Sequence, residues 1–188
     1  MKFKGTIVIT DPCYLDNDRP GTDNQDWWDE SSYGEDLSLI GLSDYISMDT
    51  LYGDWSCFTY KGAKEEVTEL EDSWNRKFFE FFNKYNFGGL TGAQRDSLRN
   101  EFMSDKNKFI EEHTLGEFCA DAGKVCVVYL DEVLKFNPYF EEWAKRHPWC
   151  VTIIEDFDGD VDYTVGEEMD LHLVGTGNKP FYTAQAGL

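Results

Sequence analysis

The segment EDFDGDVD, residues 155–162, places five carboxylates within eight positions. Carboxylate oxygens bind hard cations, and Asp156, Asp158 and Asp160 match positions one, three and five of a calcium loop that would end at Glu167. Position six of such a loop needs glycine for its sharp turn, and here it is Val161. We therefore expect no EF-hand, and a weak cation site is the alternative that stays open.

A β-hairpin explains the same residues without a metal. CVTIIEDF and VDYTV have the composition of strands, and Asp158-Gly159 between them is a strong turn signal, because both central residues of the favoured turn need positive φ. We predict that its exposed carboxylates contribute to a surface for a basic partner. These are Glu155, Asp156, Asp158, Asp160 and Asp162.

Cys13, in TDPCYL at residues 10–15, is a candidate nucleophile. A reactive thiolate needs a neighbouring base and electropositive surroundings, whereas the three histidines (His113, His147 and His172) have no motif spacing to Cys13 and the chain is acidic. We expect a raised thiol pKa and a turn at the end of the first strand, where Pro12 holds Asp11 extended and Cys13 and Tyr14 pack inward.

Asp121 lies beside a predicted turn at Ala122-Gly123, where aspartate commonly caps backbone N–H groups. Alternatively, Asp11 and Asp121 meet at one end of a sheet as paired carboxylates. Such a pair, with magnesium, would permit a hydrolase, although HxH, HExxH and His/Cys clusters are absent. We assign no catalytic residue, metal ligand or cofactor, and expect a protein that is not an enzyme.

Two aromatic segments are candidates for binding. GTGNKPFYT, residues 175–183, lacks a phosphate-loop pattern, but Lys179, Phe181 and Tyr182 could join Asp11, Cys13, Tyr14 and Asp121 around a small anionic ligand. Packing of these aromatics in a C-terminal loop is the alternative. In DWWDE, the adjacent Trp27 and Trp28 cannot share one strand face, so we predict that one of them is exposed as a partner anchor.

The formal charge of the 188 residues is −20, with a pI near 4.3. Such a chain repels nucleic acid and anionic membranes and attracts basic proteins or cations. Residues 1–60 carry three basic and twelve acidic side chains, residues 61–115 nine and eleven, and residues 116–188 five and fourteen. Without an apolar leader or an 18-residue apolar run, and with five cysteines but no CxxC, the sequence indicates a cytoplasmic protein.

The elements expected around these residues form one domain, 1–188. Apolar residues at helical spacing from Val67 to Tyr85, a stop at Gly88-Gly89, and a capping box from Thr91 to Gln94 predict a helical hairpin at 64–114. Strands are expected in GTIVIT, GDWSCFTY, on both sides of the 122–123 turn, and on both sides of 158–159, with a short helix from Asn137-Pro138 to His147. We predict an α+β fold, a mostly antiparallel sandwich or barrel-like sheet with an inserted helical hairpin.

The segments ITDPCYL and GEFCADAGKVCVVYLDE together resemble small uncharacterised bacterial and phage proteins with a DPCY-type start and a central DAG turn. The resemblance implies an accessory protein that neutralises host defences in the host cytoplasm. We accordingly expect an acidic binding protein that engages a basic host protein as a DNA-mimic-like inhibitor. The alternatives are a protein that sequesters a signalling nucleotide and, after it, the carboxylate hydrolase; the oligomeric state stays open.

Overall fold

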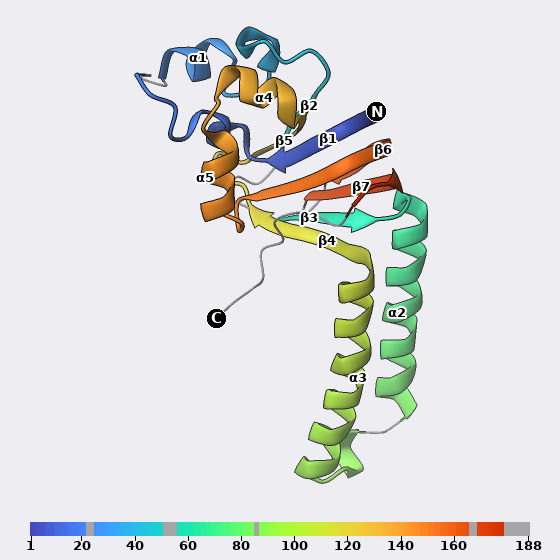
Figure 1. Cartoon of the computed structure of the whole chain (residues 1–188). Coiled ribbons are helices and arrows are strands. Elements are labelled where there is room, and N and C mark those ends of the chain that lie inside the picture. Colours follow the sequence, from blue (N-terminus) through green and yellow to red (C-terminus); the bar gives the residue numbers. More distant parts are fainter. Residues whose placement is uncertain (22–24, 51–55, 85–86, 166–168, 179–188) are drawn as a thin grey trace.

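In the part of the chain that the structure describes, seven strands form one open, curled sheet in the order β2-β5-β1-β6-β7-β3-β4. The computed structural model describes residues 1–21, 25–50, 56–84, 87–165 and 169–178 (Figure 1). All neighbouring strands are antiparallel except β3 and β7, which are parallel. The strands are β1 (Lys2–Thr10), β2 (Ile46–Asp49), β3 (Ser56–Lys61), β4 (Thr114–Cys119), β5 (Lys124–Tyr129), β6 (Val151–Val165) and β7 (Met169–Thr176).

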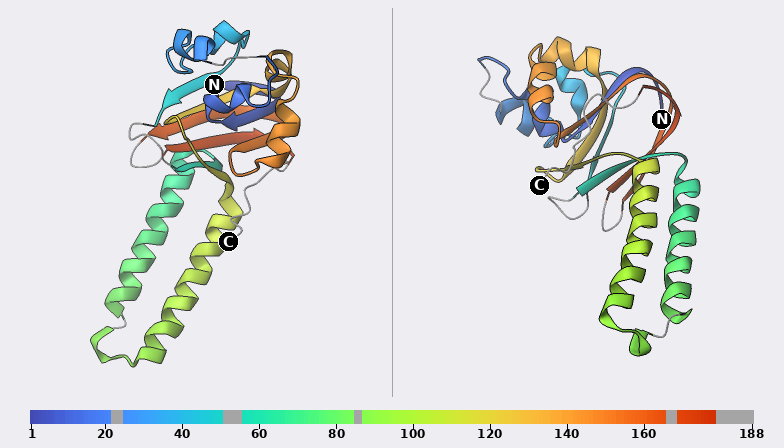
Figure 2. Two further views of the ribbon diagram at one scale, coloured as in Figure 1. Left: turned by 90° about the vertical axis from the view of Figure 1, so that its left-hand side faces the viewer. Right: turned by 60° about the horizontal axis from the view of Figure 1, so that its bottom comes forward.

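The helices fall into two groups (Figure 1). One group covers a face of the sheet: the 3₁₀ turns η1 (Pro12–Asp16) and η2 (Leu37–Ile40) with helices α1 (Gln25–Glu30), α4 (Leu130–Phe136) and α5 (Phe140–Arg146). The other group is α2 (Lys64–Lys84) and α3 (Gly92–His113), with η3 (Phe87–Gly89) between them, and Figure 2 shows it projecting away from the sheet. The predicted α+β class, a mostly antiparallel sheet with an inserted helical hairpin, is therefore confirmed, and the sheet is a single open one.

The central strands are buried on both faces. Ile7 and Ile9 of β1 pack in the core inside the curled sheet, whereas Val8 between them packs in the core under the covering helices. In β5, Val127 packs in the core inside the curled sheet and Val128 packs in the core under the covering helices. Burial on both sides explains why these strands are nearly continuous apolar runs in the sequence.

The helical hairpin leaves the sheet between β3 and β4, as predicted. Its helices meet through an aromatic cluster in which the ring of Phe102 lies 4.8 Å from those of Trp74 and Phe78. The predicted capping box is present: Gln94 Oε1 accepts from the backbone N–H of Thr91, and the Gln94 N–H donates to Thr91 Oγ1. Leu98 is half-buried like Phe102, whereas Tyr85 and the side chains of Phe109 and Ile110 lie outside the described part.

The predicted hairpin at Asp158-Gly159 is wrong. Both residues lie in the middle of β6, where Gly159 pairs with Phe3 of β1 on one side and Gly175 of β7 on the other. A Cβ on Gly159 would lie 2.2 Å from the carbonyl oxygen of Val174, so glycine is needed here for close approach of two strands and not for a turn. Between Gly5 and Ile7 the register with β1 shifts, and Asp156 has a φ of 51° within the resulting bulge.

The strands on either side of the predicted 122–123 turn do exist, but in the described structure they do not pair with each other. β4 is an edge strand beside β3, whereas β5 lies between β1 and β2. The tight turn, with Gly123 at a φ of 66°, passes between two ends of the curled sheet. Helices α1 and α4, of which α4 directly continues β5, and the strands β2 and β7 are additions to the predicted order.

Candidate functional site

Asp11 joins the DPCY segment to the DAG turn. Its side chain is fully buried, and its two oxygens accept from the backbone N–H groups of Cys13 (2.9 Å) and Ala122 (2.6 Å). Burial raises the pKa of Asp11, the two backbone hydrogen bonds oppose that rise, and the nearby charge of Asp121 adds to it. The two carboxyls therefore do share a neighbourhood, with Asp11 occupied as the N-cap of η1.

Cys13 and Tyr14 complete this junction. Burial raises the pKa of the Cys13 thiol strongly, and the Asp11 charge raises it further, as the acidic sequence predicted. Burial likewise raises the pKa of the Tyr14 hydroxyl, and its hydrogen bond to Asp121 raises that pKa further. The arrangement keeps both groups protonated and suits a structural clamp, not a nucleophile.

Trp27 and Trp28 are both half-buried, so neither is the exposed anchor that the sequence predicted. The indole N–H of Trp27 donates to the buried carboxylate of Asp16 at 2.9 Å. Trp28 packs in the turn that follows α1, where a Cβ on Gly34 would lie 2.7 Å from its ring. The DWW segment therefore serves mainly to hold that turn against the η1 segment.

The exposed aromatic of this region is Tyr33, which the sequence analysis missed. Its side chain is 60% exposed, and its ring meets Trp28 edge-on with centroids 6.2 Å apart. Ser32, Tyr33 and Gly34 have φ values of 53°, 59° and 85°, three consecutive residues in the left-handed region. Ser31 supports the turn, because its buried hydroxyl donates to the Trp28 carbonyl and accepts from the Gly34 N–H, both at 2.9 Å.

Acidic residues surround this turn. Residues 20–60 contain nine acidic side chains and no lysine or arginine. We call the described surface from α1 to β2, with α4 beside it, the acidic cap. Its exposed carboxylates are Asp29, Glu30, Glu35, Asp36, Asp44, Asp49 and Asp131, and its exposed apolar side chains are Tyr33 and Leu39.

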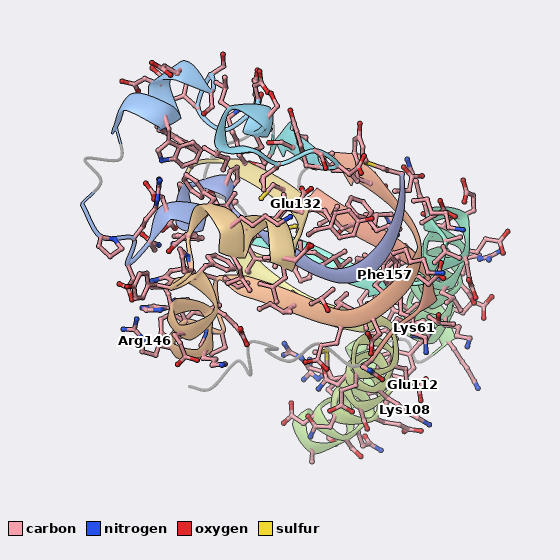
Figure 3. All side chains as sticks on the ribbon, turned by 45° about the horizontal axis from the view of Figure 1, so that its top comes forward. Lys61, Lys108, Glu112, Glu132, Arg146 and Phe157 are labelled. Atoms are coloured by element: carbon pink, nitrogen blue, oxygen red, sulfur yellow. The ribbon has the colours of Figure 1, made fainter. Side chains whose placement is uncertain are left out.

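One contact fastens the acidic cap to β5 of the sheet, and a second fastens α4 to the rest of the cap. Lys124, 6% exposed, donates from Nζ to Glu35 and Asp49; burial alone would lower its pKa, but these hydrogen bonds raise it. Glu132 of α4 (labelled in Figure 3) accepts from the Ser43 backbone N–H at 2.9 Å and from its hydroxyl at 2.5 Å. The other carboxylates of the cap lie on a surface that has been positioned by these contacts.

The carboxylates predicted at the hairpin tip instead run along β6. Phe157 and Val161 point into the core, whereas Asp158, Asp160 and Asp162 alternate with them and face outward. The carboxylate oxygens of Asp158 lie 3.2 Å from Lys4 Nζ and 3.9 Å from Lys2 Nζ, both on the neighbouring strand β1. Two lysines therefore partly neutralise this acidic row, whereas in the acidic cap Lys124 pairs with Glu35 and Asp49.

A cavity of about 380 Å³ opens where the hairpin meets the curled sheet. Lys61, Glu112 and Phe157 line it, and Figure 3 shows them gathered at this junction. Gly177 and Asn178 also line it, and the chain continues from there to the predicted ligand residues Lys179, Phe181 and Tyr182, which lie outside the described part. Asp11, Cys13, Tyr14 and Asp121 are not among the residues that line this cavity.

Buried His172 lies on β7 near the base of the hairpin, and the sequence analysis gave it no role. It is 3% exposed, its Nε2 lies 3.2 Å from Thr164 Oγ1, and its ring stacks on Tyr60. Nδ1 has no hydrogen-bond partner among the described residues. Burial lowers its pKa, with smaller opposing effects from Asp162 and Glu65.

Within the described ranges, no group of three or more His, Cys, Asp or Glu side chains is arranged to hold a metal ion. Nor is any described helix long and apolar enough to cross a membrane. No family model, curated protein or solved structure matches this chain.

Proposed function

We propose that this chain is a non-enzymatic acidic binding protein that engages a basic protein through its acidic cap. The observation that carries the proposal is Tyr33: a 60% exposed aromatic side chain held on three consecutive left-handed residues, among carboxylates. Non-glycine residues in that region cost about 1 kcal/mol each or more, and such strain tends to be retained where it serves a site.

The charge distribution supports a basic partner. A surface with seven exposed carboxylates attracts a basic patch over long range and speeds the encounter, and this attraction falls as salt screens it. Tyr33 and Leu39 then supply apolar contact at close range, as aromatic anchors do in protein interfaces. The role implied by the resemblance, a DNA-mimic-like inhibitor acting on a host protein in the host cytoplasm, is the form of this function that we favour.

The second candidate is a small-molecule binder, and the 380 Å³ cavity favours it. This volume falls in the usual range for ligand pockets. Lys61 at the cavity would supply positive charge for an anionic ligand such as a nucleotide. The net charge of −20 opposes it, which is why it stands second.

Affinity capture tests the first proposal. The tagged full chain is incubated with nuclease-treated bacterial lysate at low salt, washed with rising salt, and its bound proteins are identified by mass spectrometry. We expect one stoichiometric basic protein that elutes as salt rises. A variant with Glu30→Gln, Asp44→Asn and Asp131→Asn should lose it, whereas Asp158→Asn with Asp160→Asn and Asp162→Asn, an equal charge change on β6, should retain it.

An empty capture, or equal loss in both variants, would contradict the proposal. Native mass spectrometry of the purified chain with a nucleotide library would then test the second candidate. In that experiment Lys61→Ala should weaken any adduct, because Lys61 lies at the cavity.

A further inference from the structure

The helical hairpin carries an apolar groove on its distal part. The groove has a volume of about 810 Å³ and runs between α2 and α3. One wall is aromatic, with Trp74, Phe78 and Phe79 from α2, and the other wall carries Arg95 and Arg99 from α3. Phe79 is 65% exposed, so part of this aromatic surface faces solvent in the isolated chain.

The charge of this part of the hairpin is opposite to that of the rest of the chain. Residues 74–104 carry five basic and three acidic side chains, on a chain of net charge −20. Among the groove residues that the structure describes, Asp96 is the one carboxylate, beside Arg95 and Arg99, so this described lining is net positive. The groove therefore suits an acidic and apolar occupant, and the basic partner of the acidic cap does not fit it.

The dimensions indicate what form that occupant takes. The lining residues of α3 extend from Gly92 to Met103, which is about 17 Å at 1.5 Å per residue, or three helical turns. Arg95 and Arg99 are four residues apart and thus lie on one helix face. A helix in the groove would meet them with two carboxylates at the same spacing, and would bury apolar side chains at i, i+3 or i+4, and i+7 against the aromatic wall.

We propose that the groove binds an acidic amphipathic helix of a partner protein. A second copy of this chain fits less well, because a two-fold axis must pair identical faces. Parallel hairpins would bring two basic tips side by side, and antiparallel hairpins would oppose the two arginine walls. The proposal goes beyond the acidic cap, because it assigns a second surface that takes a partner of the opposite charge.

A display library of 12-residue helical peptides, selected on the full chain, tests this proposal. We expect the enriched peptides to share apolar residues at i, i+3 or i+4, and i+7, with Asp or Glu at an i, i+4 spacing. One enriched peptide is then synthesised with a fluorophore, and its dissociation constant is measured by anisotropy for each variant. Circular dichroism verifies that each variant keeps its helix content.

Arg99→Glu and Phe79→Ala should each raise the dissociation constant of the peptide by about ten-fold or more. Arg99→Glu removes a charge-assisted hydrogen bond, and Phe79→Ala removes an aromatic contact. Lys77→Glu is the matched control. It makes the same charge change on the same hairpin, but Lys77 lines a different cavity and should change affinity less than about two-fold.

Enrichment of basic peptides, or of no shared pattern, would overturn the proposal, as would equal losses in Arg99→Glu and Lys77→Glu. Competition by a nucleotide would assign the groove to a small anion instead. Self-association of the wild type that Phe79→Ala abolishes, measured by sedimentation, would assign it to a second copy. Either result would contradict a helix from a partner, and neither bears on the acidic cap.

Discussion

At the scale of single residues, the sequence motifs prove to be structural clamps. Asp11 satisfies two backbone N–H groups from segments more than a hundred residues apart. Asp16 and Asn137 act similarly: Asp16 accepts from Trp27, and the Asn137 amide donates to the carbonyls of Leu15 (3.0 Å) and Asn17 (2.7 Å). The DPCY pattern thus fixes the platform on which the acidic cap lies.

Asp11→Asn tests this role. An asparagine oxygen replaces only one of the two acceptors, and its NH₂ group faces the other N–H, so the free energy of unfolding should fall by about 2 kcal/mol. Urea denaturation measures the change. Asp160→Asn, an exposed carboxylate on β6, is the control and should change stability by less than about 0.5 kcal/mol; an equal effect of both changes would refute the clamp.

Tyr33→Gly separates strain from binding. Glycine adopts positive φ without cost, so the free energy of unfolding should rise by up to about 1 kcal/mol. Loss of the exposed ring should weaken binding of the basic partner. Ser32→Gly relieves the same kind of strain and should leave binding unchanged. Denaturation and affinity capture measured in parallel decide the matter, and retained binding in Tyr33→Gly would remove Tyr33 from the interface.

His172 predicts a pH dependence. Burial lowers its pKa below the ordinary value, so the unfolded chain takes up a proton that the folded chain resists. The stability that His172 contributes is therefore complete above pH of about 6.5 and is lost as pH falls below it, by at most about 1.4 kcal/mol per pH unit.

The groups that face His172 are Asp162 of β6 and Lys64 and Glu65 of α2, together with Thr164 and Tyr60. His172→Gln should flatten the fall in the free energy of unfolding between about pH 7 and 5, measured by urea titrations at each pH. Curves that run parallel for the wild type and the variant would show that His172 does not titrate differently on unfolding.

At the scale of elements, β6 is the strand that joins the two sides of the sheet. It pairs along its length with β1 and β7, and its bulge at Glu155–Asp156 lets Ile154 and Phe157 face the same core. The outward-facing Asp158, Asp160 and Asp162 thus alternate with buried residues. The acidic segment is therefore the solvent side of a central strand.

Gly159→Ala tests the close approach of β6 and β7. A Cβ at 2.2 Å from the Val174 carbonyl oxygen forces the strands apart, so we expect a loss of about 2 kcal/mol or more. Gly89→Ala is the control, because a Cβ there meets nothing within 4 Å. Thermal unfolding of both variants measures the difference, and an unchanged melting temperature for Gly159→Ala would contradict the strand pairing.

The helical hairpin was predictable because its signals are local: a 3.6-residue apolar period from Val67 and a capping box at Thr91. The pairing of the strands was not. Asp158-Gly159 resembles a turn locally, but partners more than a hundred residues away on β1 and ten to twenty residues away on β7 decide its conformation. The meeting of Asp11 and Asp121 was one of two alternatives, but capping of the Ala122 N–H by Asp11 was not predicted. Exposure of Tyr33 rather than Trp27 depends on a turn with no sequence signature.

At the scale of the whole molecule, charge is divided between two surfaces. The acidic cap lies at one end of the sheet, and the hairpin, whose distal part is basic and aromatic, projects from another part (Figure 2). The two proposals together assign partners of opposite charge to separate surfaces of the chain. The acidic cap is the surface on which the proposed function rests.

The most direct test of that function is the association rate constant of the captured basic partner, measured by stopped flow as ionic strength rises from about 20 to 300 mM. Charge steering predicts a fall of about ten-fold or more for the wild type. It also predicts a much flatter dependence for the variant with Glu30→Gln, Asp44→Asn and Asp131→Asn. A rate constant that does not change with salt, or an equally steep fall in that variant, would contradict an acidic cap that recruits a basic protein.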